Sequence, residues 1–387
     1  MTECPARGID RAPAKVSPLP TDKSLAVLIE RLAETLLIAV AGGLGVGLTG
    51  VPGGYLSGSI LAVAGAALAG RPMVIPASIV RTIFVLLGVS LGSVMTPQML
   101  QGMAKYPVSI AILLVAMACV GIACALYLQI VHGWDCVSAY LASAPGGMSQ
   151  VLAVAAEVAS DVRAIAIVQS MRVVIVAVGL PSGLSLLGLA SHASRPAGSP
   201  LTLASLDEFA ILSVAAVIGA LIFHRLRFPG GLLFGAMFAS GALHGTDVVH
   251  FILPWWATNT AAILLGAVIG ARFTNMPMRL FMNYIGAAFG SIAVAVTIAS
   301  VFGTIVIELM SLPVPEVMVA FAPGSVDAMM LLALALHLDP VFVGAHHVVR
   351  IFFVALATPF MVRREAGKAK PAAGTAVPEA MQAPLDE

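Results

Sequence analysis

Long apolar stretches, separated by short polar turns, fill most of the chain. They predict helices near residues 25–48, 54–70, 76–96, 106–131, 163–190, 209–224, 229–245, 257–272, 280–307 and 340–362. Two further segments, about 138–158 and 317–337, contain Pro and Gly and are predicted to be broken or re-entrant. The ends, 1–24 and 363–387, lack such stretches and are predicted to be disordered tails. The pattern indicates an all-α polytopic membrane protein with about ten transmembrane helices and two broken segments.

Composition supports this class and excludes others. Hydrophobic residues make up 59% of the 387 residues and charged residues only 10%, whereas soluble domains carry roughly 25% charged residues. The 20 Lys and Arg are thinly spread against 19 Asp and Glu and form no basic stripe with interleaved aromatics. We therefore expect the lipid bilayer as a partner and no direct contact with nucleic acid.

An internal repeat organises the chain. Ala144-Pro145-Gly146 recurs as Ala322-Pro323-Gly324, at an offset of 178 residues. The same offset relates Asp161 to Asp339, Arg172 to Arg350, and the pair Gly88/Gly92 to Gly266/Gly270. The chain is therefore predicted to be a tandem duplication of about 180 residues, with repeat 1 at 25–190, a linker at 191–208 and repeat 2 at 209–362. The small-xxx-small glycine pairs are expected at helix contacts.

The distribution of arginines indicates how the repeats lie in the membrane. If each repeat crosses five times from a cytoplasmic N-terminus, Arg225, Arg227, Arg272 and Arg279 fall on the cytoplasmic side, as the positive-inside rule favours. An odd number of crossings makes the repeats inverted, an architecture typical of secondary transporters with a site near the midplane. We expect a bacterial inner membrane protein with both termini in the cytoplasm.

The Ala-Pro-Gly elements are candidate binding elements. Proline removes a backbone donor, so a helix ends there, and the helix that restarts beyond it presents free N–H groups that attract anions. An ordinary loop between two spans is the alternative. The residues predicted to bind substrate here are Pro145, Gly146, Gly147 and Ser149 in the first repeat, and Pro323, Gly324, Ser325 and Asp327 in the second.

Arg172 and Arg350 are the second group of candidates. Each lies eleven residues after its Asp, so about 16 Å along the helix and near the middle of the bilayer. A charge there is costly and should face the protein interior, where it meets a substrate or has a purely structural role in a buried ion pair or a carbonyl clamp. Gln169 precedes Arg172 by three residues, and His346 and His347 precede Arg350 by four and three, so these side chains share its helix face and are included in the predicted substrate site.

Asp161 and Asp339 precede the helices that carry the arginines. An Asp in this place is an ordinary helix cap, and contact with a coupling ion such as Na⁺ or H⁺ is the alternative. No helical pair of metal ligands such as HExxH occurs in the chain, so we predict neither a metal site nor a cofactor.

With these motifs the chain resembles the duplicated membrane family labelled AbrB. The resemblance covers about 25–362. It rests on two sets of residues, which are Ala144–Gly147 with Asp161 and Arg172, and Ala322–Gly324 with Asp339, His346, His347 and Arg350. The family pattern is similar to APGG followed by an acidic residue, and this chain departs from it at Ser149 and at Ser325. The resemblance implies a duplicated membrane protein, and the family's labels imply an ammonia monooxygenase or a membrane regulator of gene expression.

Three functions follow from these predictions. The first is a secondary transporter of a small anionic solute, bound near the midplane between the two repeats. The second is a membrane-embedded regulator that acts through a protein partner. The third, a monooxygenase, requires a bound metal and is the least favoured, so we do not expect an enzyme. Assembly into a homo-oligomer is compatible with all three.

Overall fold

The computed structural model describes residues 25–94, 106–144, 148–158, 160–189, 203–246 and 248–368. The first half contains α1 (Leu25–Gly47), α2 (Gly54–Leu68), α3 (Ala77–Gly92), α5 (Tyr106–His132), α6 (Cys136–Ser143), α7 (Met148–Glu157) and α8 (Val162–Leu186). The second half contains α9 (Leu203–Arg225), α10 (Gly231–Gly245), α11 (Trp255–Gly270), the 3₁₀ turn η2 (Ala271–Phe273), α12 (Met278–Met310), α13 (Val314–Phe321), α14 (Val326–Ala335) and α15 (Pro340–Lys368).

The prediction of an all-α membrane protein is confirmed. Each of the ten predicted helices is present, and each interrupted segment is a pair of short helices, α6 with α7 and α13 with α14. Five segments are long and apolar enough to cross a membrane: α5, α8, Leu206–Arg225 of α9, α12 and Pro340–Ala357 of α15. On α9 the side chains of Ile218, Leu221 and Ile222 are about half exposed, as expected of a surface that contacts lipid.

The two halves carry the same succession of helices. α1 and α9 each have 23 residues, α2 and α10 have 15, α3 and α11 have 16, α6 and α13 have 8, and α7 and α14 have 10. The residue types that precede equivalent helices recur as well. α2 and α10 follow Gly53 and Gly230, whose positive φ angles of 70° and 67° favour glycine, and α3 and α11 follow Pro76 and Pro254.

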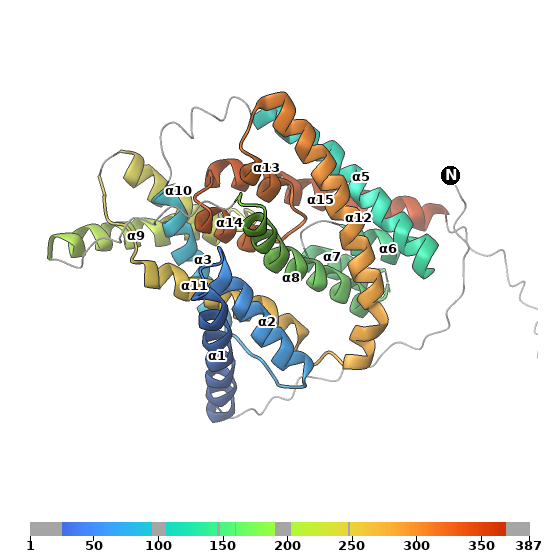
Figure 1. Ribbon diagram of the computed structural model, residues 1–387, viewed down its shortest axis with the longest axis horizontal. Coiled ribbons are helices and arrows are strands. Elements are labelled where there is room, and N and C mark those ends of the chain that lie inside the picture. The colour runs from blue at the N-terminus through green and yellow to red at the C-terminus, as the bar shows by residue number, and fades with distance from the viewer. Residues whose placement is uncertain are drawn as a thin grey trace, which may run out of the picture.

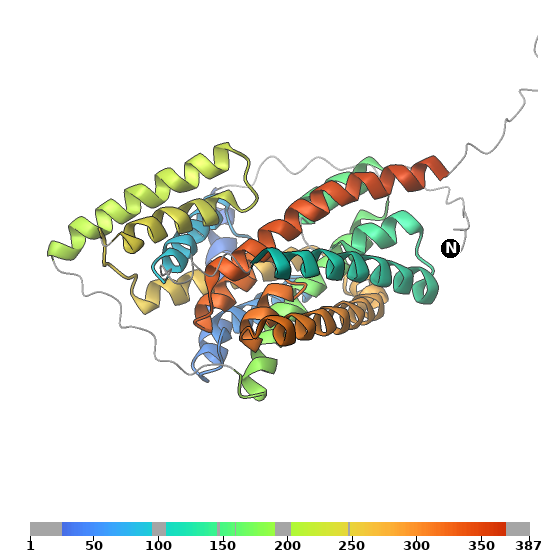
Figure 2. The same cartoon turned by 90° about the horizontal axis from the view of Figure 1, so that it is seen from above.

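Helices of both halves mix in each of two bundles (Figures 1 and 2). The first bundle consists of α1–α3 and α9–α11, and the second of α5–α8 and α12–α15. Within the first bundle α2 packs on α11 and α3 packs on α10, and within the second bundle α5 packs on α12. By position in the two halves, α2 corresponds to α10 and α3 corresponds to α11. The contact of α2 with α11 is therefore equivalent to the contact of α10 with α3, as expected of two halves related by a two-fold axis.

Glycine pairs allow the close contacts of the first bundle. A Cβ atom at Gly266 would lie 2.7 Å from the carbonyl oxygen of Leu56, and one at Gly270 would lie 3.0 Å from that of Ile60. A Cβ atom at Gly88 or at Gly92 would likewise lie too close to backbone atoms of α10. The glycines predicted to mark helix contacts therefore do so, at equivalent positions in both halves.

The two bundles meet along α8 and α14. In the described part of the chain, α8 packs against α2 and α11, and α14 packs against α3 and α11. The hydroxyl of Ser57 in α2 donates to the carbonyl of Ala177 in α8 across this junction, at 3.3 Å. The junction therefore runs beside the broken helices, all of which belong to the second bundle.

Candidate functional site

The helices that flank both breaks belong to the second bundle. α6 ends at Ser143 and α7 begins at Met148, while α13 ends at Phe321 and α14 begins at Val326. α8 packs on α6 and α7, and α15 packs on α13 and α14. The long helix that follows each break thus runs alongside it and carries the arginine that the repeat pattern singled out.

Arg350 binds the end of α13. Its Nη1 donates to the carbonyl oxygens of Ala322 at 2.6 Å and Gly324 at 3.5 Å, and its Nη2 donates to that of Ala320 at 2.9 Å. The side chain is only 2% exposed. The guanidinium therefore supplies donors to carbonyls at the end of α13 and in the turn after it, of which the carbonyl of Ala322 also accepts from the amide of Gly324 at 2.8 Å.

Arg172 does the same in the first half. Its Nη2 donates to the carbonyl of Ala144 at 2.9 Å and its Nη1 to that of Ser143 at 3.4 Å. Ala144 corresponds to Ala322, so the bond to this carbonyl is equivalent in the two repeats, whereas the other carbonyls that the two arginines bind are not. Both arginines thus form the carbonyl clamp that the sequence left open as the structural alternative. The Nε atoms of Arg172 and Arg350 are buried and have no hydrogen-bond partner among the described residues.

Gln169 and His347 complete the two clamps. Gln169 Nε2 donates to the carbonyl of Leu141 at 2.8 Å, and His347 Nε2 donates to that of Val319 at 3.2 Å. In an unbroken helix these carbonyls would accept from the amide four residues on, but that residue is the proline of the Ala-Pro-Gly element, which has no N–H. The two side chains replace the missing donors at equivalent places.

His346 has no polar counterpart, because the first repeat carries Val168 there. Its ring is fully buried, and its Nδ1 donates to the carbonyl of Phe342 at 2.8 Å. Its Nε2 lies 2.9 Å from the hydroxyl of Ser109, which in turn contacts the carbonyl of Tyr106 at 3.0 Å. This chain of bonds joins α15 to α5 and exists in one half only.

Asp161 and Asp339 cap the helices that carry the arginines. The Oδ1 of Asp161 accepts from the amide of Ala164 at 3.1 Å. The Oδ1 of Asp339 accepts from the amides of Val341 at 2.8 Å and Phe342 at 3.2 Å. Both aspartates are therefore ordinary N-caps, the first of the two interpretations that the sequence allowed.

Each of these carboxylates also receives a tyrosine from the other half. Tyr106 in α5 donates to Asp339 Oδ2 at 3.0 Å, and Tyr284 in α12 donates to Asp161 Oδ2 at 3.2 Å. The two tyrosines are themselves 178 residues apart. Sequence reasoning missed both, although their spacing at the repeat offset was a signal that could have found them.

The remaining candidates lie at the breaks. Ser325 is the N-cap of α14, since its hydroxyl accepts from the amide of Ala328 at 3.4 Å, and Asp327 lies in the first turn of that helix. Pro323 and Gly324 form the turn between α13 and α14. In the first half, Pro145, Gly146 and Gly147 lie outside the described residues, and of Ser149 only the backbone, in α7, is described.

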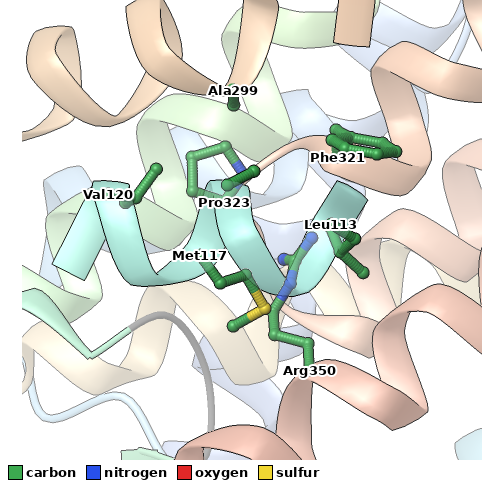
Figure 3. Close-up of a pocket in the computed structure, with 8 residues that line it drawn as sticks. Leu113, Met117, Val120, Ala299, Phe321, Pro323 and Arg350 are labelled. Atoms are coloured by element: carbon green, nitrogen blue, oxygen red, sulfur yellow. The ribbon is translucent and has the colours of Figure 1, made fainter. Parts of the chain in front are cut away.

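A small pocket opens beside the second break (Figure 3). Seven apolar residues line it together with Arg350: Leu113, Ala116, Met117 and Val120 of α5, Ala299 of α12, Phe321 and Pro323. Figure 3 shows the guanidinium of Arg350 lying among Leu113, Met117 and Pro323. The pocket has room for about one water molecule.

The charge of the arginines is not balanced by carboxylates in the described part of the chain. The ion pair found there, Arg71 with Glu34 at 3.2 Å, lies on the surface of the first bundle. The interior of the second bundle therefore carries two positive charges that backbone carbonyls compensate only in part.

Comparison with known proteins places the chain in a family. Residues 55–365 match the family model described as "Transition state regulatory protein AbrB". The chain belongs to the AbrB family. It is 26% identical over 348 residues to "Uncharacterized protein YhjN" of Bacillus subtilis, covering 84% of this chain and 91% of that one. It is 24% identical over 327 residues to "Putative regulator AbrB" of Escherichia coli, covering 81% and 90%. No solved structure shows a significant match.

Arg272 is a further charged residue that this AbrB-family protein places near the breaks. It lies in η2, at the end of α11, with its Nη1 3.9 Å from the sulfur of Met148 in α7. It also interacts electrostatically with Asp327 of α14. The sequence used Arg272 only to orient the repeats, since Val94 stands at the equivalent position and no repeated signal marked it.

The described residues of this AbrB-family protein contain no group of three or more His, Cys, Asp or Glu side chains placed to hold a metal ion. His346 and His347 follow one another in α15, but they bond to α5 and to α13 respectively. The two histidines therefore do not converge on a common metal position.

Proposed function

We propose that this AbrB-family protein is a secondary transporter of a small anionic solute. The observation that carries the proposal is the pair of equivalent helix breaks, whose flanking helices α6, α7, α13 and α14 all pack in one bundle. Irregular backbone is tolerated at membrane depth only where protein or a cavity surrounds it, and transporters use such breaks to bind substrate and ions. The two repeats contribute one break each, as expected of a site formed by both.

The charges favour an anion as the substrate. Arg172 and Arg350 are buried without a carboxylate partner in the described residues, and each retains an Nε–H that bonds to none of them. Their Nη groups hold the ends of α6 and α13, which fixes the guanidinium planes. Such prearranged positive groups in a low-dielectric interior attract an anion strongly, since little reorganisation is needed on binding.

The two-bundle arrangement provides the moving parts. In our proposal the second bundle, which carries the site, shifts as a body against the first bundle and exposes the site to either side of the membrane in turn. Arg272 of the first bundle and Asp327 of the second carry opposite charges, and their attraction would favour one of the two positions. A coupling ion, Na⁺ or H⁺, would supply the driving force.

The test is ion-driven flux in proteoliposomes. Purified protein would be reconstituted and exposed to a panel of small carboxylates, inorganic anions and amino acids, with and without gradients of Na⁺ or H⁺. We expect saturable uptake of at least one anion, at least tenfold slower for Arg350→Lys, which keeps the charge but loses the planar fork. Arg71→Ala, which breaks the surface ion pair, is the matched control and should transport normally. No flux of any anion in either gradient would contradict the proposal.

A membrane-embedded regulator is the second candidate. It is favoured by the names of the family model and of the Escherichia coli relative. In this case the same site would sense a solute and the signal would pass to a protein partner. Deletion of the gene would then change the RNA profile in the absence of any change in solute uptake, whereas altered uptake with unchanged expression would favour the transporter.

A further inference from the structure

The pocket beside Arg350 combines an apolar wall with one unsatisfied donor. Seven of its eight lining residues have apolar side chains. The eighth, Arg350, is 2% exposed, and its Nε–H is buried without a hydrogen-bond partner among the described residues. An unpaired N–H on a charged group in an apolar surrounding costs free energy, so an acceptor in the pocket would be strongly favoured.

The charge of Arg350 determines which kind of hydrogen-bond acceptor is favoured in the pocket. A water molecule would satisfy the Nε–H but leave the charge uncompensated. The seven apolar side chains offer that water no hydrogen bond, whereas buried water usually has about three. A monovalent anion satisfies the donor and neutralises the charge of Arg350 at the same time.

The size of the pocket limits which anions can bind. The pocket has room for about one water molecule, and Met117, the most flexible of its lining side chains, can move to admit a slightly larger body. We infer that this pocket, between Arg350, Met117 and Pro323, is a binding site for a small monovalent anion of the size of chloride or formate. Sulfate and phosphate are excluded, because their additional oxygens and second charge would be buried against apolar side chains without partners.

This inference names the substrate class of the proposed transporter, and it rests on that proposal only for the claim that the anion is carried. Binding itself depends on the pocket and on Arg350. A bound chloride that is not transported would still be the counter-ion of the clamp. Binding and flux are therefore measured separately.

The first experiment measures binding to the full-length protein in detergent, in a gluconate buffer free of chloride. Chloride, bromide, formate, sulfate and phosphate would be titrated at constant ionic strength while the melting temperature is followed. We expect a saturable increase with the first three anions and none with sulfate or phosphate. Equal shifts with all five salts, or no shift, would overturn the inference.

A variant that fills the pocket makes the test specific. Ala116→Leu narrows the pocket while Arg350 itself is kept, and it should weaken chloride binding at least tenfold. Val115→Leu, on the exposed face of the same helix, is the control and should leave chloride binding unchanged. Met117→Ala enlarges the pocket and should extend binding to acetate and propionate. Unchanged selectivity in folded Ala116→Leu and Met117→Ala proteins would contradict the inference.

A measurement on the wild-type protein covers the case in which neither variant folds. The line width of the ³⁵Cl NMR signal should increase in the presence of the protein, and formate should reverse the increase. No broadening would exclude chloride. Halide binding without flux would refute the transporter and keep the site, whereas flux of another anion without halide binding would refute the site and keep the transporter.

Discussion

At the scale of single residues, the polar side chains buried in the second bundle replace what the helix breaks remove. The proline of each Ala-Pro-Gly element has no N–H, so the carbonyl four residues before it lacks its usual helical donor. These carbonyls belong to Leu141 and Val319. Gln169 and His347 supply the two missing donors. Different residue types thus perform the same task at equivalent positions, since both present a side-chain N–H at similar reach.

Replacing His347 by Gln, the residue type at the equivalent position of the first repeat, tests this equivalence. His347→Gln should retain the bond to the Val319 carbonyl and change the free energy of unfolding by less than about 1 kcal/mol. His347→Leu leaves that buried carbonyl unpaired and should destabilise the protein by about 1–3 kcal/mol. Denaturant or thermal unfolding in detergent would measure both. Equal destabilisation by the two variants would show that the ring, rather than its N–H, is what matters.

The tyrosine–aspartate bonds link the halves. Tyr106→Phe removes one hydrogen bond to the carboxylate of Asp339 and should cost about 1.5–3 kcal/mol of stability, as is usual for bonds to charged groups. Tyr284→Phe should have a similar effect through Asp161. Tyr127→Phe is the control, because its bond to His132 is exposed. The same unfolding experiments measure all three, and an equal loss in Tyr127→Phe would refute a special role for the buried pairs.

At the scale of elements, glycines and prolines decide how closely helices approach and where they stop. The breaks place helix ends in the interior of the second bundle, where side chains of α8 and α15 satisfy their carbonyls. In the first bundle, glycines on α3 and α11 let the backbones of α10 and α2 come into contact. Packing of this kind is the main source of helix association in membranes, because lipid provides no hydrophobic driving force between helices.

The glycine contacts give a matched pair of substitutions. A Cβ at Gly266 would lie 2.7 Å from the carbonyl oxygen of Leu56, so Gly266→Ala should destabilise the fold by about 1–3 kcal/mol through overpacking. At Gly65 in α2 a Cβ would meet nothing within 4 Å, so Gly65→Ala should be neutral or stabilise by about 0.5–1 kcal/mol. Melting temperatures in one detergent would compare them. A stabilising Gly266→Ala would mean that α11 and α2 do not pack as described.

At the scale of the whole molecule, each of the two bundles contains helices from both halves of the chain. Repeat boundaries in the sequence therefore do not coincide with the bodies seen in space (Figure 1). The division into a bundle with the breaks and a bundle without them is what gives the proposed transporter a part to move and a part to hold it.

Inverted repeats predict that equivalent turns lie on opposite sides of the membrane. The turn after α1 contains Thr49 and the equivalent turn after α9 contains Leu226, and both residues are exposed. In a protein with its four native cysteines replaced, Thr49→Cys should react with an impermeant thiol reagent from outside intact cells. Leu226→Cys should react only after the cells are opened. Labelling of both from outside would show that the repeats are parallel.

Much of the fold could be predicted because membrane helices leave a strong local signal. Ten apolar stretches became ten helices, and the two segments with Pro and Gly became broken pairs, since a proline cannot continue a helix whatever surrounds it. The site was harder to predict. The arginines were recognised from their depth in the helix, whereas Tyr106, Tyr284 and Arg272 face the site from helices distant in sequence.

The sequence by itself determined the helices, their breaks, the duplication and the buried arginines, because each follows from local hydrophobicity, backbone chemistry or the comparison of one half with the other. Only the tertiary structure decided which carbonyls Arg172 and Arg350 bind, that each aspartate pairs with a tyrosine of the other repeat, and that a pocket lies beside Arg350. These are contacts between residues about 30 to more than 200 positions apart. Such contacts depend on how helices pack, and no local pattern in a single sequence records that packing.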